Sequence, residues 1–150
     1  MIHWSSSIKI HKPPEMVFEF LANIQDVPQA GDSPVIALDL ITDGLPRLGS
    51  KYREGVQVMP FFKGEILSEI TAFDLNQLLE LTWTGPGMQG IDQYELMEVP
   101  GGTSLNHEKW TYGDGVLRVV EPLMRLALIL RLEQRLVAIK HLLEGSDEDL

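Results

Sequence analysis

Two side chains in the middle of the chain have the chemistry of a binding or catalytic site. In the predicted strand that begins at Gly49, alternation places Glu54 on the same face as the apolar Tyr52 and Val56. A carboxylate among apolar neighbours has its charged form disfavoured and its pKa raised, so Glu54 is a candidate proton donor or hydrogen-bonding group for a ligand. Pairing with a cation, or a place at the rim of the fold, would give it a structural role instead.

His107 is the second candidate. It shares a predicted face with Thr103 and Leu105, whereas Asn106 and Glu108 lie on the other face of the same strand. A histidine titrates near neutral pH and can act as a base or as a hydrogen-bond donor, although a lone histidine in a strand is more often a packing residue. Both interpretations of this residue remain open.

Aromatic and apolar side chains at further positions are expected to form the walls of a ligand site. Such sites use broad apolar surfaces with polar tips, although the same residue types are also ordinary core material. Tyr94 is expected to join Glu54 and His107 in orienting the polar end of a ligand. The expected walls are Tyr52, Trp83, Trp110, Met124 and Leu128.

The composition excludes several classes of protein. A chain of 150 residues fits one domain over residues 1–150. The absence of cysteine excludes disulfides, thiolate metal sites and cysteine nucleophiles.

The 12 Lys and Arg against 22 Asp and Glu leave a net charge of −10, which disfavours binding to nucleic acid or to anionic lipid surfaces. With no secretory signal and no apolar run of about 20 residues, we expect a cytoplasmic protein without a transmembrane segment.

Other motif-like features do not point to a site. The stretch from Gly85 to Gly90 matches G-x-G-x-x-G, but a strand rather than a helix is predicted to follow it, so a dinucleotide site is not expected. The four histidines are dispersed, and we predict neither a metal site nor a cofactor. No catalytic motif is recognisable, so no catalytic residue is assigned.

The elements that would position these residues follow from the pattern of apolar residues and turns. Alternation from Ile2 to Ile10 predicts an edge strand that ends before Pro13, and a short helix is expected over 14–24. A long helix is predicted over 121–144, and residues 143–150 are expected to form a frayed acidic tail. Between the helices, glycine and proline turns predict six strands, at 35–43, 49–59, 62–74, 78–84, 90–99 and 103–113.

The long helix has two apolar stripes. One is expected to pack on the sheet and consists of Leu128, Leu132, Leu136, Ile139 and Leu143. The other lies nearly opposite and consists of Leu123, Leu126, Leu130 and Val137. Burial of a leucine contributes about 1.5–3 kcal/mol, so we predict that a homodimer contact or a mobile lid covers the second stripe. Coverage by another segment of the same chain is the alternative.

The order of elements and several local sequences resemble the START-like, or Bet v 1-like, helix-grip superfamily. The segment from Ile8 to Ala22 is similar to the opening of its polyketide cyclase/dehydrase and lipid transport branch. Further similar segments are Gly49 to Arg53, Tyr94 to Leu96, Gly101 to His107 and Leu142 to Glu144. The resemblance covers essentially the whole chain, and its motifs concern structure rather than chemistry.

This resemblance implies an α+β helix-grip fold, in which a curved antiparallel sheet of seven strands wraps around a long C-terminal helix, with one or two short helices after the first strand. It also implies an apolar cavity that binds lipids, polyketides, hormones or other hydrophobic molecules. The leading hypothesis is therefore a binder of a small hydrophobic ligand. A polyketide cyclase/dehydrase-like enzyme, and a protein-interaction or stress-related module, are the alternatives.

Overall fold

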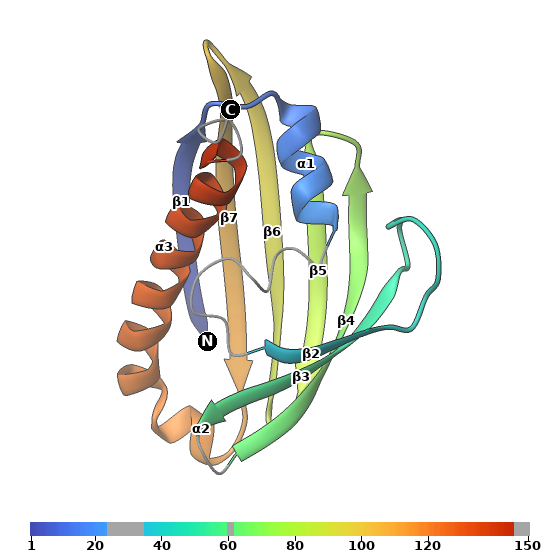
Figure 1. The fold of residues 1–150 in the computed structure, drawn as a ribbon. Helices are drawn as coiled ribbons and strands as arrows, with labels where there is room; N and C mark the ends of the chain where they lie inside the picture. Colours follow the sequence, from blue (N-terminus) through green and yellow to red (C-terminus); the bar gives the residue numbers. More distant parts are fainter. Residues whose placement is uncertain (24–34, 60–61, 146–150) are drawn as a thin grey trace.

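Seven strands of the described chain form one antiparallel sheet (Figure 1). The computed structural model describes residues 1–23, 35–59 and 62–145. The strands lie side by side in the order β1-β7-β6-β5-β4-β3-β2, so β1 and β2 are the two edges. Their bounds are β1 (Ile2–Ile10), β2 (Val35–Leu40), β3 (Lys51–Met59), β4 (Phe62–Asp74), β5 (Leu78–Gly85), β6 (Met88–Val99) and β7 (Gly102–Gly113).

The helices of the described chain are α1 (Pro14–Ala22), α2 (Val116–Val119) and α3 (Glu121–Gly145). Proline stands in the first turn of α1, where its missing N–H would have no intrahelical partner in any case. The predicted helices and strands are confirmed to within a few residues, although the expected end of the first helix at Ile24 lies outside the described residues. The short α2, just before α3, was not expected from the sequence.

Both α1 and α3 pack against one face of the sheet, which we call the inner face. The alternation that predicted the strands places Leu79, Tyr94 and Leu105 on this face, where they are buried. Val17, Phe18 and Leu21 of α1 cover part of it. The buried stripe of α3 covers another part beside β1, with Leu132, Leu136, Ile139 and Leu143 in the core.

The last turn of α3 is part of the folded core, which corrects the expectation of a frayed tail from residue 143. Leu143 is buried, and the helix continues to Gly145. Helical spacing explains this, because Leu143 follows Ile139 by four residues on the same stripe. Residues 146–150 of the expected tail lie outside the described part of the chain.

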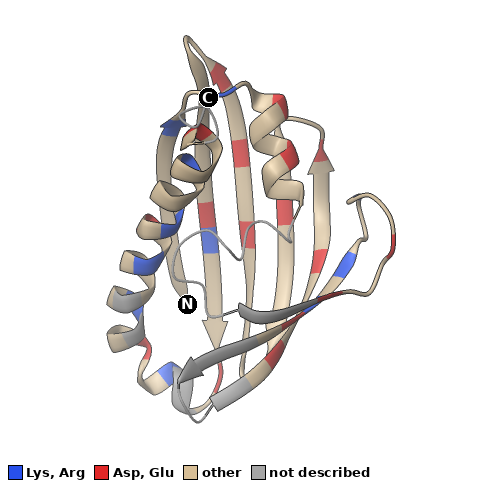
Figure 2. Ribbon diagram, in the orientation of Figure 1, with Lys and Arg blue, Asp and Glu red and all other residues tan. Residues whose placement is uncertain are grey.

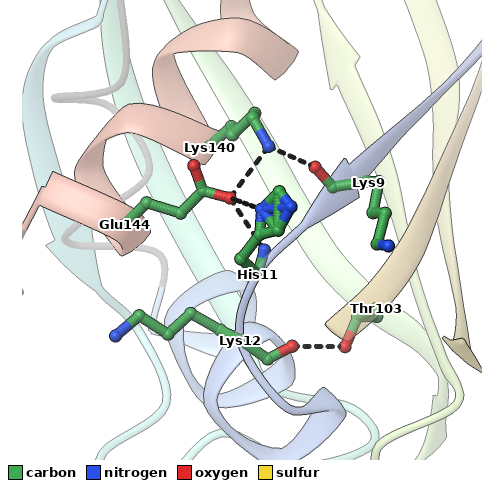
Figure 3. A network of polar contacts seen from close by, with 6 residues as sticks. All are labelled: Lys9, His11, Lys12, Thr103, Lys140 and Glu144. Carbon is green, nitrogen blue, oxygen red and sulfur yellow. Dashed lines mark hydrogen bonds and ion pairs between the residues drawn. The ribbon is translucent and has the colours of Figure 1, made fainter. Parts of the chain in front are cut away.

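A polar clasp joins the C-terminal end of α3 to the end of β1 (Figure 3). Glu144 accepts hydrogen bonds from the backbone N–H of His11 at 2.7 Å and from Nζ of Lys140 at 2.8 Å. The same Lys140 ammonium donates to the carbonyl of Lys9 at 2.5 Å. Nearby, the hydroxyl of the buried Thr103 on β7 donates to the carbonyl of Lys12 at 2.7 Å. The contacts of Lys140 and Glu144 tie the end of α3 to the end of β1, and the Thr103 bond ties the segment after β1 to β7.

Candidate functional site

The register of β6 and β7 brings four polar side chains together on the inner face. Tyr94 on β6 lies directly opposite His107 on β7, and Asp92 lies opposite Lys109. All four positions share one face because side chains two residues apart in a strand point the same way. The pairing therefore builds a compact group of ionisable and aromatic residues from two neighbouring strands.

His107 is enclosed on both sides by aromatic rings. The Tyr94 ring stacks on the imidazole with 4.2 Å between ring centroids, and Trp4 of β1 meets it edge-on at 5.1 Å. The imidazole is 0% exposed. Its Nε2 forms a hydrogen bond of 2.8 Å with Oδ1 of Asp92. The ring is thus held in one orientation by packing and by a carboxylate.

Burial and the charges around Asp92 together set the protonation state of His107. Burial alone would raise the pKa of Asp92, but the Lys109 ammonium at 3.2 Å and the hydrogen bond from His107 hold it well below its usual range. Burial lowers the pKa of His107 more than Asp92 raises it, so the imidazole is neutral at neutral pH. A neutral ring that donates from Nε2 to the carboxylate carries a lone pair on Nδ1.

Arg135 reaches this group from the opposite layer. It lies on α3 three residues after Leu132 and four before Ile139, so it belongs to the helix stripe that faces the sheet. The helix carries lysine and arginine along its length (Figure 2). Burial opposes the charged form of Arg135, but Tyr94, Asp92 and Glu54 outweigh it and raise the pKa of the guanidinium. The residue therefore remains a cation inside the fold.

Glu54 of β3 completes the group from another part of the sheet. Burial raises the pKa of its carboxyl, and Asp92 adds to the effect, while Arg135 and Lys109 oppose it. The neutral form of Glu54 is therefore favoured more than in a solvated glutamate. This placement agrees with the sequence expectation that Glu54 faces inward.

A large aromatic side chain borders the same region from β5. Trp83 lies opposite Gly90 of β6, and a Cβ atom at position 90 would overlap with its indole ring. Glycine at this position therefore lets the indole approach the backbone of β6 closely. The ammonium of Lys109 lies 5.1 Å from the centroid of the Trp83 ring, within cation–π distance.

Three buried nitrogen atoms of this region have no hydrogen-bonding partner among the described residues. They are Nε1 of Trp83, Nδ1 of His107 and Nε of Arg135. More than nine in ten buried polar groups in proteins are paired, so three unpaired atoms within one region require an explanation. We call the residues of this region the inner polar cluster: Glu54, Trp83, Asp92, Tyr94, His107, Lys109 and Arg135.

The expected site residues divide between this cluster and other parts of the fold. Glu54, Trp83, Tyr94 and His107 belong to the cluster. Trp110 does not, because its position next to Lys109 turns it to the outer face, where its ring stacks on His3 at 5.1 Å. This corrects the expectation that Trp110 forms a wall beside His107.

Three expected wall residues remain: Leu128, Met124 and Tyr52. Leu128 is half-buried on α3. Met124 also lies on α3, but its side chain is outside the described part of the structure. Tyr52 is buried and lines a separate groove of about 540 Å³ between α1, the β2–β3 connection and the β4–β5 turn. Glu15 and Glu19 of α1 stand at this groove beside apolar residues.

Sequence reasoning did not single out Asp92, Lys109 and Arg135. The only sequence signal for Asp92 and Lys109 is alternation, which places Asp92 on the same face as Tyr94 and Lys109 on the same face as His107. Arg135 interrupts the sheet-facing stripe of the long helix, and a charged residue at such a position is the clearest sequence signal of the three. None of these signals identifies a partner across the fold.

The second apolar stripe of α3 is exposed. Leu123 is 81% exposed, Leu126 68%, Leu130 53% and Val137 47%.

No helix in the described part of the chain has the length and apolar character needed to cross a membrane. The described residues also contain no group of three or more His, Asp or Glu side chains arranged to hold a metal ion.

The comparisons with known proteins concern the fold. No protein-family model matches the chain, and no curated protein sequence matches it. Similar solved structures include a conserved protein from Geobacillus kaustophilus, with a TM-score of 0.80 and 16% identity over 97% of both chains. The protein TTHA0849 from Thermus thermophilus has a TM-score of 0.77 and 13% identity over 96% of this chain and 98% of that one.

Ara h 8.0201 is similar as well, with a TM-score of 0.67 and 13% identity over 95% of this chain and 97% of that one. At these identities the likeness extends to the fold and no further. The seven-stranded antiparallel sheet, the short helix after the first strand and the long C-terminal helix are shared features. The chain therefore has the α+β helix-grip fold of Bet v 1-like proteins, as the sequence resemblance implied.

Proposed function

We propose that the protein binds a small hydrophobic molecule between the inner face of the sheet and α3, with the polar end of that molecule at the inner polar cluster. The proposal rests on three buried nitrogen atoms, on Trp83, His107 and Arg135. None of them has a hydrogen-bonding partner among the described residues. Leaving such a group buried and unpaired costs about 1–3 kcal/mol. A ligand that supplies the missing partners would remove that cost.

The arrangement of the cluster supports a binding role over a purely structural one. Asp92 accepts one hydrogen bond on each carboxylate oxygen, from His107 and from Lys109, so its contacts are explained without a ligand. The indole N–H of Trp83 and the Nε–H of Arg135 are donors that need acceptors, while Nδ1 of His107 is an acceptor. Rigid aromatic and apolar surfaces surrounding a few convergent polar atoms are typical of small-molecule sites.

A titration with N-phenyl-1-naphthylamine, a neutral apolar fluorophore, tests the proposal. The expected result is saturable binding of one probe per chain, accompanied by energy transfer from the tryptophans. Native mass spectrometry of the purified protein provides an independent readout, in which a copurified small molecule is expected to be displaced by the probe. Absence of saturable binding, together with a ligand-free mass, would contradict the proposal.

The exposed stripe of α3 requires a control in this experiment, because apolar probes also bind to surface patches. The double variant L126Q/L130Q removes apolar area from the stripe and leaves the inner polar cluster unchanged. Binding that persists in this variant locates the probe away from the stripe. Binding that disappears would assign the probe to the stripe and overturn the proposal.

The Asp92–His107 pair favours a second candidate function, acid–base catalysis of the polyketide cyclase/dehydrase kind. A carboxylate that fixes the tautomer of a neutral imidazole leaves the other ring nitrogen available as a base, which is the arrangement used in many enzymes. Holding a flexible substrate in a reactive conformation would supply much of the rate. Turnover of a polyketide-like substrate that is lost in H107Q but kept in H141Q would support this function.

The exposed leucines of α3 are the basis of a third proposal, a homodimer through Leu123, Leu126, Leu130 and Val137. Four large exposed apolar side chains on one helix face are of the kind found at interaction sites. Sedimentation equilibrium is expected to show a dimer that dissociates in the variant L126E. A monomer at all protein concentrations up to the millimolar range would rule out this contact.

A further inference from the structure

Two N–H donors of the inner polar cluster require an acceptor, and the described part of the protein does not provide one. The Trp83 indole can only donate, and its Nε1 is buried without a partner among the described residues. The Nε–H of Arg135 is in the same position. Both residues interact with the same ion pair: the Trp83 ring lies 5.1 Å from the Lys109 ammonium, and the charge of Arg135 interacts electrostatically with that of Asp92.

The nearby carboxyl groups do not serve these donors. The two oxygens of Asp92 accept from His107 and from Lys109, and neither Nε1 of Trp83 nor Nε of Arg135 forms a hydrogen bond with them. Glu54 is near enough to interact electrostatically with Arg135, but burial favours the neutral form of its carboxyl. An acceptor for Trp83 and Arg135 is therefore expected to come from a bound molecule.

The charges of the cluster determine the type of acceptor. Lys109 and Arg135 are two largely buried cations, and Asp92 is the carboxylate of the cluster whose charge the surroundings stabilise. His107 is neutral because burial lowers its pKa, and burial raises the pKa of Tyr94 to about 12, so neither adds charge at neutral pH. Lys109 is paired with Asp92, whereas the Nε–H of the Arg135 cation has no acceptor among the described residues, so an anion is the acceptor that matches its charge.

We infer that the bound molecule is a hydrophobic anion whose charged oxygen group, such as a carboxylate, accepts hydrogen bonds from the guanidinium of Arg135 and the indole N–H of Trp83. The guanidinium suits this role because it presents several N–H groups in one plane to a carboxylate. The inference rests on the proposed function and adds to it the chemical class of the ligand. Arg135 then acts as a specificity-determining residue supplied by the helix.

Two fluorescent probes that differ only in an anionic group test this inference. 8-Anilinonaphthalene-1-sulfonate is N-phenyl-1-naphthylamine with one added sulfonate. Since charge-assisted hydrogen bonds are roughly twice as strong as neutral ones, we expect the anionic probe to bind about tenfold more tightly or better. Equal affinity for the two probes, or tighter binding of the neutral one, would overturn the inference.

Variants of the two donors separate their roles from general packing. R135M keeps the length of the side chain and removes its N–H groups, and W83F keeps an apolar ring. Each is expected to weaken binding of the anionic probe by about tenfold and to change binding of the neutral probe by less than about twofold. The matched control is R131M, because Arg131 is exposed on the same helix. It should change neither affinity.

The probe titrations distinguish failure of the proposed function from failure of the anion site. If neither probe binds to the wild type, the proposed function itself fails. If R135M and W83F weaken both probes equally, the two residues act through packing and the anion site is rejected. If circular dichroism shows that R135M does not fold, R135K takes its place. R135K keeps the positive charge but loses the planar guanidinium with its several N–H groups, so it is expected to lose part of the preference for the anionic probe. An unchanged preference in R135K and W83F would reject the assignment.

Discussion

His107 bonds diagonally to Asp92 across β6 and β7, while the residue directly opposite it, Tyr94, stacks on its ring. The diagonal contact puts the carboxylate at Nε2 and leaves Nδ1 without any partner among the described residues. A single pair of strands thus fixes both the orientation and the tautomer of the imidazole.

Our first prediction concerns this tautomer. Nitrogen-15 NMR of the imidazole should show a neutral ring protonated on Nε2 at pH 7, because Asp92 accepts that proton. Burial lowers the pKa of His107, so the ring should stay neutral below pH about 6.5, where an unfolded histidine becomes protonated. Its contribution to stability is therefore present above pH about 6.5 and falls as the pH is lowered through the folded-state value. The exposed His141 is the internal reference, and a His107 that protonates first would contradict the prediction.

A second prediction is that D92N strongly destabilises the fold. The change leaves the Lys109 ammonium without its carboxylate and removes the charged acceptor of His107. Removing one partner of a buried ion pair typically costs about 3–5 kcal/mol in the free energy of unfolding. Urea denaturation measures the loss, with D74N at the exposed end of β4 as a control expected to lie within about 0.5 kcal/mol of the wild type. Similar curves for the two variants would count against a buried pair.

Glu54 leads to a pH-dependent prediction. Burial raises the pKa of its carboxyl, so its contribution to stability is fully present below the unfolded pKa and is lost as the pH rises through the folded pKa. The variant E54Q mimics the protonated form at every pH. It should be more stable than the wild type at pH 7–8 and lose this advantage near pH 4. The exposed Glu95 on the outer face provides the control variant E95Q, for which urea curves should show no such crossover.

The clasp at the end of α3 supports a fourth prediction. E144Q weakens the hydrogen bonds from Lys140 and from the N–H of His11, so amides in the last two turns of α3 should exchange faster with solvent. Because the carboxylate is partly exposed, we expect a loss of only about 1 kcal/mol. The hydrogen bond from Lys140 lowers the pKa of Glu144, so this stabilisation is present above the unfolded pKa and is lost as the pH falls through the folded pKa. The same exchange rates in E133Q and E144Q would argue against the clasp.

The contact between Gly90 and Trp83 supports a fifth prediction. G90A adds a Cβ atom that overlaps with the indole ring of Trp83 and with the backbone carbonyl oxygen of Trp110, so both the ring and the local backbone must shift. Overpacking of this kind costs about 1–3 kcal/mol, and tryptophan emission should shift. At Gly145 an added Cβ meets no described atom within 4 Å, which makes G145A the matched control. Unchanged emission in G90A would show that the indole does not lie over this glycine.

Most of the fold could be predicted from local patterns, because each element has its own periodicity and its own boundary residues. The predicted strand at 62–74 and the observed β4 have the same bounds, and the helix predicted over 121–144 ends one residue early. The candidate site could be predicted only in part. Residue type and alternation predicted Glu54, Tyr94 and His107 as site residues. Trp110 was predicted to face inward, but it lies on the outer face.

Local sequence patterns were sufficient for the strands, the long helix and the direction of most side chains, because periods of 2 and about 3.6 residues are properties of the backbone. The meeting of Asp92, Lys109 and Arg135 around His107 depends on the folded arrangement, since they come from two strands and a helix. Electrostatic interactions depend on distance and burial rather than on separation along the chain. The protonation states of the cluster, and the unpaired atoms on which the proposed ligand rests, therefore exist only in the folded protein.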